Sequence, residues 1–313
     1  MYTHTTVLLH EAVDLLDCVP GKTYADGTLG GAGHSALICS KIQPSGLLLC
    51  TDNDPAALEN ARERLGPYIA NGTARLFNRN YDELGEIMAA EGITGLDGIL
   101  LDLGLSFNQI ANSRRGFSFA KDEPLDMRMN PNKGITAAKV INEFKENELA
   151  DIFYQLGEER FSRQIAYRIV NVRQRRPIES SLELAEIVSA VIRSKSKSKE
   201  KIHPATRVFM ALRIYVNAEL EHLRNFLGQA GAWLNPGGRI AVISFHSLED
   251  RLVKHTFREM ATGCTCPRSV PVCICGRKEA FKVLTRKAIR PADDETAANP
   301  MARSAFLRGL QKL

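Results

Sequence analysis

The sequence predicts an α/β fold in which a helical insertion interrupts a parallel, doubly wound sheet. Three observations lead to this prediction. Short apolar runs alternate with helical stretches in the first third of the chain, a glycine-rich turn follows the first run, and the apolar rhythm returns near residue 239. Strands that alternate with helices pair in parallel and are covered on both faces.

Four strands and three helices are expected in the first third, because apolar runs there are bounded by turn residues. The expected strands are residues 23–26, 46–52, 74–77 and 98–103. The expected helices are residues 34–41, 55–65 and 81–91. Pro55 suits the first turn of its helix, and GLLLCTD at 46–52 is the continuous apolar run typical of a buried parallel strand.

This rhythm stops at residue 106. Residues 106–132 are rich in Gly, Pro, Asn and Arg. Helical patterns follow at 137–191 and 204–234, and a fifth apolar strand is expected at 239–245. Candidate closing strands are residues 281–285 and 304–310. We therefore expect a sheet domain in two parts, with a helical insertion between them. The expected boundaries are 1–106, 107–207 and 208–313.

Composition sets several classes of protein aside. The 313 residues are 44% hydrophobic and 25% charged, as in soluble globular proteins. No apolar run approaches the roughly 20 residues that cross a bilayer, and MYTHTTVLLHEAVDLL lacks the basic start of a secretory signal. Seven cysteines, an odd number, indicate a reducing compartment. We expect a cytoplasmic enzyme or nucleic-acid-binding protein.

The charge is unevenly distributed. Residues 160–215 hold 13 Lys+Arg against 4 Glu, and residues 251–313 hold 13 against 5 acidic residues, whereas the remainder holds 15 against 27. Two basic blocks on an acidic body indicate a polyanionic partner. The alternative is that these cations coat solvated helix faces.

The glycine-rich turn DGTLGGAGH at 26–34 indicates a nucleoside-containing cofactor. Its glycines let a ligand approach the backbone, and Asp52, at the end of the second strand, is placed to bind ribose hydroxyls. Asp26 would repel a diphosphate but attract an ammonium group. We therefore favour S-adenosylmethionine over a dinucleotide. The alternative is that Asp52 caps the following helix, but Asp54, directly before Pro55, is better placed for that role.

Two further polar residues follow predicted strands. Asp102 ends the fourth strand, and His246 follows the fifth. Open α/β sheets hold their ligands at this edge, so both are candidate catalytic residues. The alternatives are that Asp102 caps a turn and that His246 is a hydrogen-bonded structural histidine.

Five separated segments resemble, in order, motifs of the MraW family. Its members are RsmH-type methyltransferases that act on the N4 amine of a cytosine in small-subunit ribosomal RNA. The segments are DGTLGGAGH (26–34), RGFSFAKDEPLDMRM (115–129), GEERFSRQIA (157–166), HPATRVFMALRIYVN (203–217) and PGGRIAVISFHSLEDR (236–251). The resemblance implies a Rossmann-like class I methyltransferase sheet with a helical insertion domain between strands 4 and 5. It also implies S-adenosyl-L-methionine as methyl donor and the decoding region of 16S rRNA in the small ribosomal subunit as substrate.

The resemblance also implies site residues. Besides Asp26, the cofactor contacts would fall on Ala32, Gly33, His34, Asp52, Tyr81, Asp102 and Gln109. At 81 the family commonly has Phe, and Tyr keeps the ring that can stack on adenine. The Asp/Asn-Pro-Pro-aromatic tetrad of many amine methyltransferases is absent, so Asp102 is the best remaining acceptor for the amine. Because the tetrad is absent, a non-catalytic ribosome-binding protein is one rival interpretation. A second rival, a DNA amine methyltransferase, would be expected to carry the tetrad.

The insertion is expected to recognise RNA through six arginines. They are Arg160, Arg163, Arg168, Arg173, Arg175 and Arg176. Two Cys-x-Cys pairs are candidate ligands of a structural zinc, because four thiolates complete a tetrahedral shell. They are Cys264, Cys266, Cys273 and Cys275, in a basic loop at 264–275. The alternative is four uncoordinated thiols. The sequence does not give the oligomeric state.

Overall fold

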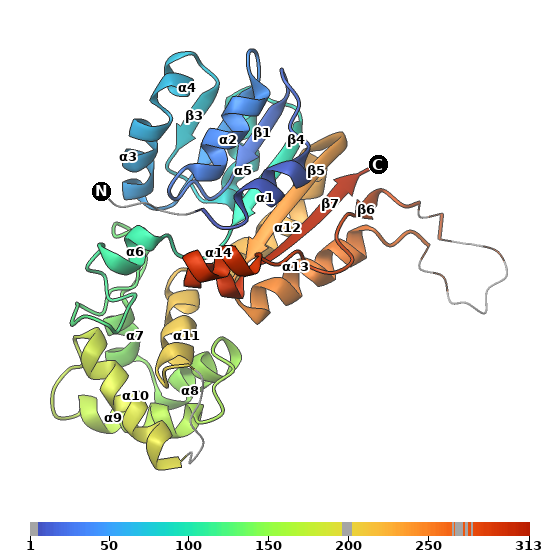
Figure 1. Ribbon diagram of the computed structural model, residues 1–313. Helices are drawn as coiled ribbons and strands as arrows, with labels where there is room; N and C mark the ends of the chain where they lie inside the picture. Colours follow the sequence, from blue (N-terminus) through green and yellow to red (C-terminus); the bar gives the residue numbers. More distant parts are fainter. Residues whose placement is uncertain (1–5, 196–201, 265, 267–271, 273–274, 277) are drawn as a thin grey trace. The chain divides into compact units, whose positions relative to one another are not determined.

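The computed structural model describes residues 6–195, 202–264, 266, 272, 275–276 and 278–313. The chain forms two compact units. Unit 1 comprises Met1–Gly104 and Glu221–Leu313, and unit 2 comprises Leu105–Leu220. Figure 1 shows a sheet flanked by helices in unit 1 and an all-helical unit 2.

Unit 1 is built on a seven-stranded sheet of the described residues, with the order β3-β2-β1-β4-β5-β7-β6. Its strands are β1 (Thr23–Asp26), β2 (Leu47–Thr51), β3 (Ala74–Phe77), β4 (Leu96–Asp102), β5 (Leu234–Ser244), β6 (Phe281–Val283) and β7 (Phe306–Lys312). The first five are parallel, and β7 runs antiparallel between β5 and β6. The predicted α/β fold, with a largely parallel sheet and a helical insertion between β4 and β5, is confirmed.

Helices cover both faces of the sheet, because alternate strand residues point to opposite sides. Leu48 and Cys50 pack in a core with α1, α2 and α3, whereas Leu49 packs in a second core with α5, α12 and α13. The helices of unit 1 are α1 (Leu9–Leu16), α2 (Gly33–Ile42), α3 (Pro55–Arg64), α4 (Gly66–Ala70), η1 (Tyr81–Glu83), α5 (Leu84–Ala90), α12 (Glu219–Trp233, which begins at the end of unit 2), α13 (Ser247–Met260), α14 (Asp293–Ala298) and η2 (Pro300–Ser304).

Unit 2 has its own apolar core. Its helices are α6 (Phe107–Ala111), α7 (Ala137–Glu143), α8 (Glu146–Gln155), α9 (Ser162–Arg173), α10 (Ser181–Lys195) and α11 (Thr206–Val216). The expected end of the insertion at 207 falls inside α11. Because Val208, Phe209 and Leu212 of this helix pack in the core of unit 2, the unit continues to Leu220.

Several expected elements differ in extent. The fifth strand was expected at 239–245, but β5 already begins at Leu234 and runs through the Asn-Pro-Gly-Gly segment, with a register irregularity opposite Leu96 and Gly98. The single helical region expected at 204–234 is two helices, separated at Ala218, whose φ is +48°. Among the described residues, no helix is both long and apolar enough to cross a membrane.

Candidate functional site

The turn between β1 and α2 is held in a left-handed conformation by its own backbone. Gly30 and Ala32 have φ of +47° and +56°, and the Ala32 amide donates to the Leu29 carbonyl at 2.6 Å. α2 then begins at Gly33. A Cβ atom at Gly33 would lie 1.9 Å from Thr6 Oγ1, so only glycine fits where the N-terminal segment crosses this turn.

Asp26 is buried at the carboxyl end of β1. Its Oδ2 accepts a hydrogen bond from Ser35 Oγ at 2.6 Å, and its Oδ1 accepts one from the Thr28 amide at 3.1 Å. Burial raises the pKa of this carboxyl to about 7, although both hydrogen bonds act in the opposite direction. A buried carboxyl that has no cationic partner within the described part of the chain is suited to receive a cationic group from a ligand.

Asp52 follows β2, beside the same turn. Its Oδ2 accepts from the Gly30 amide at 2.9 Å, and its Oδ1 accepts from the Asp54 amide at 2.8 Å. Asp54, not Asp52, caps α3, because its side chain accepts from the Ala56 amide. Each carboxylate oxygen carries more than one lone pair, so Asp52 can anchor the turn and still accept from a ligand hydroxyl.

Asp102 ends β4, next to β1 in the sheet. Its amide donates to Thr28 Oγ1 at 2.5 Å, which ties it to the glycine-rich turn. About a fifth of the side chain is exposed (22%), but Oδ1 is covered and has no hydrogen-bond partner among the described residues. Burial, and then the charges of Asp26 and Glu249, raise the pKa of this carboxyl well above its usual value.

His34 lies in the first turn of α2. Its Nε2 is 3.1 Å from the Val7 carbonyl oxygen, so this nitrogen carries the proton and donates it. Its Nδ1 is 3.6 Å from Asp102 Oδ2. The structure therefore brings His34, Asp26 and Asp102 together beside the glycine-rich turn, as predicted for one site.

His246 is the N-cap of α13, and its Nδ1 accepts from the Glu249 amide at 3.4 Å. Its Nε2 lies 3.1 Å from Glu249 Oε1. Glu249 is buried and its Oε2 accepts from the Phe245 amide at 2.9 Å. The Nδ1 atom thus caps the helix, whereas the buried Nε2 forms no hydrogen bond among the described residues. The charge of the neighbouring Glu249 acts on Asp102.

Tyr81 and Gln109 lie in different units. Tyr81 begins η1, and its ring meets Phe226 edge-on, with the ring centroids 5.8 Å apart. Gln109 lies in unit 2, where its Oε1 accepts from the Ser106 amide at 2.9 Å and closes the capping box of α6. Its amide group is therefore engaged in local structure.

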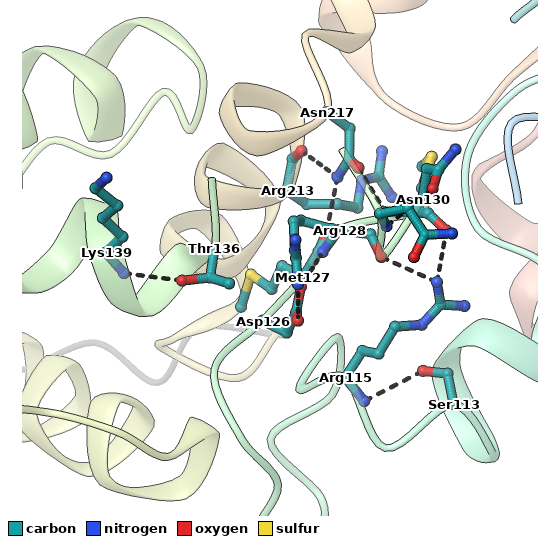
Figure 2. A network of polar contacts seen from close by, with 12 residues as sticks. Ser113, Arg115, Asp126, Met127, Arg128, Asn130, Thr136, Lys139, Arg213 and Asn217 are labelled. Atoms are coloured by element: carbon teal, nitrogen blue, oxygen red, sulfur yellow. Dashed lines mark hydrogen bonds and ion pairs between the residues drawn. The ribbon is translucent and has the colours of Figure 1, made fainter. Parts of the chain in front are cut away.

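The segment 113–130 in unit 2 is held by a network of polar contacts (Figure 2). Arg115 donates to the carbonyl oxygens of Arg128 and Met129. Asn217 accepts from the Met129 amide at 2.7 Å and donates to the Met127 carbonyl at 2.8 Å. Met127 is buried with φ of +59°, a conformation that a bulky residue keeps only when its surroundings enforce it.

The six candidate arginines have different environments. Arg163 and Arg168 are exposed on α9, where exposed Tyr167 lies between them in sequence. Arg173 donates to the carbonyls of Ile141 and Phe144, which joins α9 to α7 and its C-cap. The remaining three are also exposed; Arg160 lies over the Phe161 ring, Arg176 pairs with Glu183, and Arg175 follows α9.

Three of the four candidate zinc ligands are described by the structure, and their sulfur atoms lie close together. The Sγ atoms of Cys264, Cys266 and Cys275 all lie within 4.8 Å of one another. The sulfur atoms of Cys264 and Cys275 lie 3.8 Å apart. Cys273 lies outside the described residues.

Sequence reasoning missed three residues of the site: Thr28, Ser35 and Glu249. The hydroxyls of Thr28 and Ser35 orient Asp102 and Asp26. Neither has a sequence signal, since both contacts depend on how the elements pack. Glu249 did have a sequence signal, because it stands three residues after the N-cap, where a Glu typically completes a capping box.

Comparisons with known proteins identify the family of the chain. Residues 1–313 match the MraW methylase family. The chain is 50% identical over 307 residues to "Ribosomal RNA small subunit methyltransferase H" of Desulforapulum autotrophicum, covering 98% of each chain. It is 49% identical over 313 residues to the protein of that name from Desulfosudis oleivorans, covering 100% of this chain and 99% of the relative. Among solved structures, a putative rRNA methylase from Clostridium thermocellum aligns with TM-score 0.46 and 10% identity, covering 99% and 100% of the two chains. The chain is thus a methylase and belongs to the MraW methylase family.

Proposed function

We propose that this protein transfers a methyl group from S-adenosyl-L-methionine to the N4 amine of a cytosine in the decoding region of 16S ribosomal RNA. The observation that carries the proposal is the Asp102 carboxyl. Its buried Oδ1 lacks a hydrogen-bond partner among the residues described, at the end of the strand beside the glycine-rich turn. An unsatisfied buried acceptor is unfavourable, so it is suited to a donor that arrives with a ligand.

The acidic side chains fit S-adenosylmethionine better than a dinucleotide. Asp26 offers a buried carboxyl to the ammonium of the aminoacyl group, Asp52 offers lone pairs to the ribose hydroxyls, and Tyr81 offers a ring to adenine. A diphosphate at this turn would face the carboxyl groups of both Asp26 and Asp52 and would be repelled by them. When bound, S-adenosylmethionine supplies an electrophilic methyl group.

The remaining task of the protein is to prepare the amine. The lone pair of the cytosine amine is delocalised into the ring, which makes it a poor nucleophile. An acceptor for one of its N–H groups favours the pyramidal, attacking form, and we assign this to Asp102. Holding both partners in place can contribute roughly 7–11 kcal/mol. We assign His246 a positioning role, because its Nε2 lies 3.1 Å from Glu249, whose charge raises the pKa of Asp102 and so favours uptake of the amine proton by that carboxylate.

The exposed side of α9 is proposed to contact RNA. Arg163 and Arg168 have exposed guanidinium groups, and Tyr167 is 60% exposed between them in sequence. Cations neutralise phosphates, and an aromatic ring stacks on unpaired bases. Of the six predicted arginines, Arg173 contributes least here, because its guanidinium is engaged with carbonyls of unit 2.

A structural zinc is proposed for the cysteine loop. Its support is the convergence of Cys264, Cys266 and Cys275 within 4.8 Å, together with Cys273, which completes the second Cys-x-Cys pair in the sequence. We expect about one zinc per chain in the purified protein. Cys264→Ser should lose it, and Cys18→Ser, at a distant packed cysteine, should retain it. Absence of zinc, with the loop thiols reacting rapidly with a thiol reagent, would contradict the proposal.

We expect the reaction to take place in the cytoplasm. The decisive experiment measures methyl transfer from radiolabelled S-adenosylmethionine to purified ribosomal particles. Small subunits from cells that lack this methylation should be labelled, and the labelled nucleoside should be N4-methylated cytidine. Large subunits are the control, and naked 16S rRNA tests whether the assembled particle is required. Label in another nucleoside, or none despite measured cofactor binding, would refute the proposed reaction.

A further inference from the structure

Four cations of the second basic block line a cavity in unit 1, near strands that lie well along the sheet from β1 and its glycine-rich turn. The cavity has a volume of about 320 Å³ and is lined by residues of α13, β6, β7 and the segment after β6. Four of its lining residues are cations: Lys254, Arg258, Arg286 and Arg308. No lining residue is acidic.

One of these cations is held in place, and three are available. Arg308 is buried, and its guanidinium is fixed by Asp250 through hydrogen bonds of 2.6 and 3.0 Å. Lys254 is half-buried, and Arg258 and Arg286 are exposed. Among the described residues none of these three has an acidic partner, so the four cations and Asp250 leave a net charge of +3.

Apolar side chains also line the cavity: the buried Phe257 and Val283 of β6. Cations beside apolar side chains suit a nucleotide unit, whose phosphate meets the cations while its sugar or base covers apolar surface. A volume near 300 Å³ is at the lower end of small-molecule sites, which suits one such unit.

We propose that this cavity is a second RNA-binding site, which holds a phosphate of the RNA strand outside the methylation site. The inference rests on the proposed RNA substrate. Lys254, Arg258 and Arg286 contact the phosphate backbone, and Arg308, whose charge is balanced by Asp250, forms a fixed wall of the cavity. Such contacts fix the register of the strand without reading its sequence.

The test compares two triple variants of the full chain. Lys254→Gln, Arg258→Gln and Arg286→Gln remove the available cations of the cavity. Arg224→Gln, Lys282→Gln and Lys287→Gln are the matched control, because these cations are exposed in unit 1 but do not line the cavity. RNA affinity is measured against salt concentration with a single-stranded fragment of 16S rRNA.

We expect the cavity variant to flatten the slope of log affinity against log salt by about 2, since each phosphate contact to a single strand contributes about 0.7. If the two affinities converge near 1 M salt, binding at about 0.15 M should weaken roughly 50-fold. KM for RNA should rise, and kcat at saturating RNA should be retained. The control should change the slope much less. Equal effects of the two variants, or an unchanged slope in the cavity variant, would overturn the inference.

Chemical protection supplies a measurement that does not depend on variants. RNA should slow acylation of Lys254 by an amine-specific reagent in the wild-type protein and leave Lys282 reactive. Equal protection of Lys254 by inorganic phosphate would assign the cavity to free anions instead. These measurements need no methyl transfer, so failure of the cavity inference is distinguishable from failure of the proposed reaction.

Discussion

Replacement of Asp26 by Asn tests the electrostatics of the site most directly. Burial raises the pKa of this carboxyl from an ordinary 3.8 to about 7. Because its folded pKa lies above its unfolded pKa, Asp26 favours the folded state at acid pH, and this stability is lost as pH rises towards 7 and above. A shift of about 3 pKa units corresponds to about 4 kcal/mol, at about 1.4 kcal/mol per unit.

Asp26→Asn removes this titration and keeps the shape of the side chain. We expect the two proteins to have similar free energies of unfolding near pH 4. The variant should become more stable than the wild type as pH rises, by up to about 4 kcal/mol near pH 8. Urea unfolding followed by fluorescence reports on this unit, because the single tryptophan, Trp233, packs in its core. A difference that stays constant from pH 4 to pH 8 would refute the argument.

The same carboxyl couples cofactor binding to pH. An ammonium placed beside Asp26 favours its ionised form, so binding should release up to about one proton at pH 6. Calorimetry in two buffers of different ionisation enthalpy measures this release. Asp26→Asn should bind S-adenosylmethionine more weakly and release no proton from this position; a wild-type release that persists in the variant would remove Asp26 from the cofactor site.

Three further variants probe the remaining parts of the proposal. Asp102→Asn should lower the single-turnover methylation rate by about 10- to 100-fold, with a smaller effect on cofactor affinity. The reason is that a hydrogen bond to a charged acceptor contributes about 1.5–3 kcal/mol. An unchanged rate would contradict the role of Asp102. Asp52→Ala should weaken S-adenosylmethionine binding by a similar factor in calorimetry, and unchanged affinity would remove it from the site. Combined Arg163→Gln and Arg168→Gln should lower the salt slope of RNA binding by about 1.4, and an unchanged slope would leave α9 as a solvated face.

The strands near the site were predictable because their signals are local. The apolar run before Asp102 and the Asp-Gly turn after β1 identified both strand ends from adjacent residues. Asp54 was correctly separated from Asp52, since a side chain two residues before Ala56 caps a helix that starts with Pro55. Periodicity and turn chemistry act over a few residues, and these features need nothing else.

Other features depend on residues far apart in sequence. The Thr28 hydroxyl meets the Asp102 amide across 74 positions, and no local pattern specifies that contact. α1 was not predicted, because its N-cap is Leu8, which makes no side-chain capping bond. The length of β5 depends on its pairing with β4 around an irregular register, so its Asn-Pro-Gly-Gly segment looked like a plain turn.

The position of β7 has a consequence for how the sheet forms during protein synthesis. β7 lies between β5 and β6, although both precede it in the chain. Until residues 306–312 leave the ribosome, β5 has an open edge and β6 has no neighbour in the sheet. Unpaired apolar strand edges promote aggregation. A nascent chain that stalls before β7 should therefore be a substrate for chaperones, even though every residue assigned to the cofactor has already been synthesised.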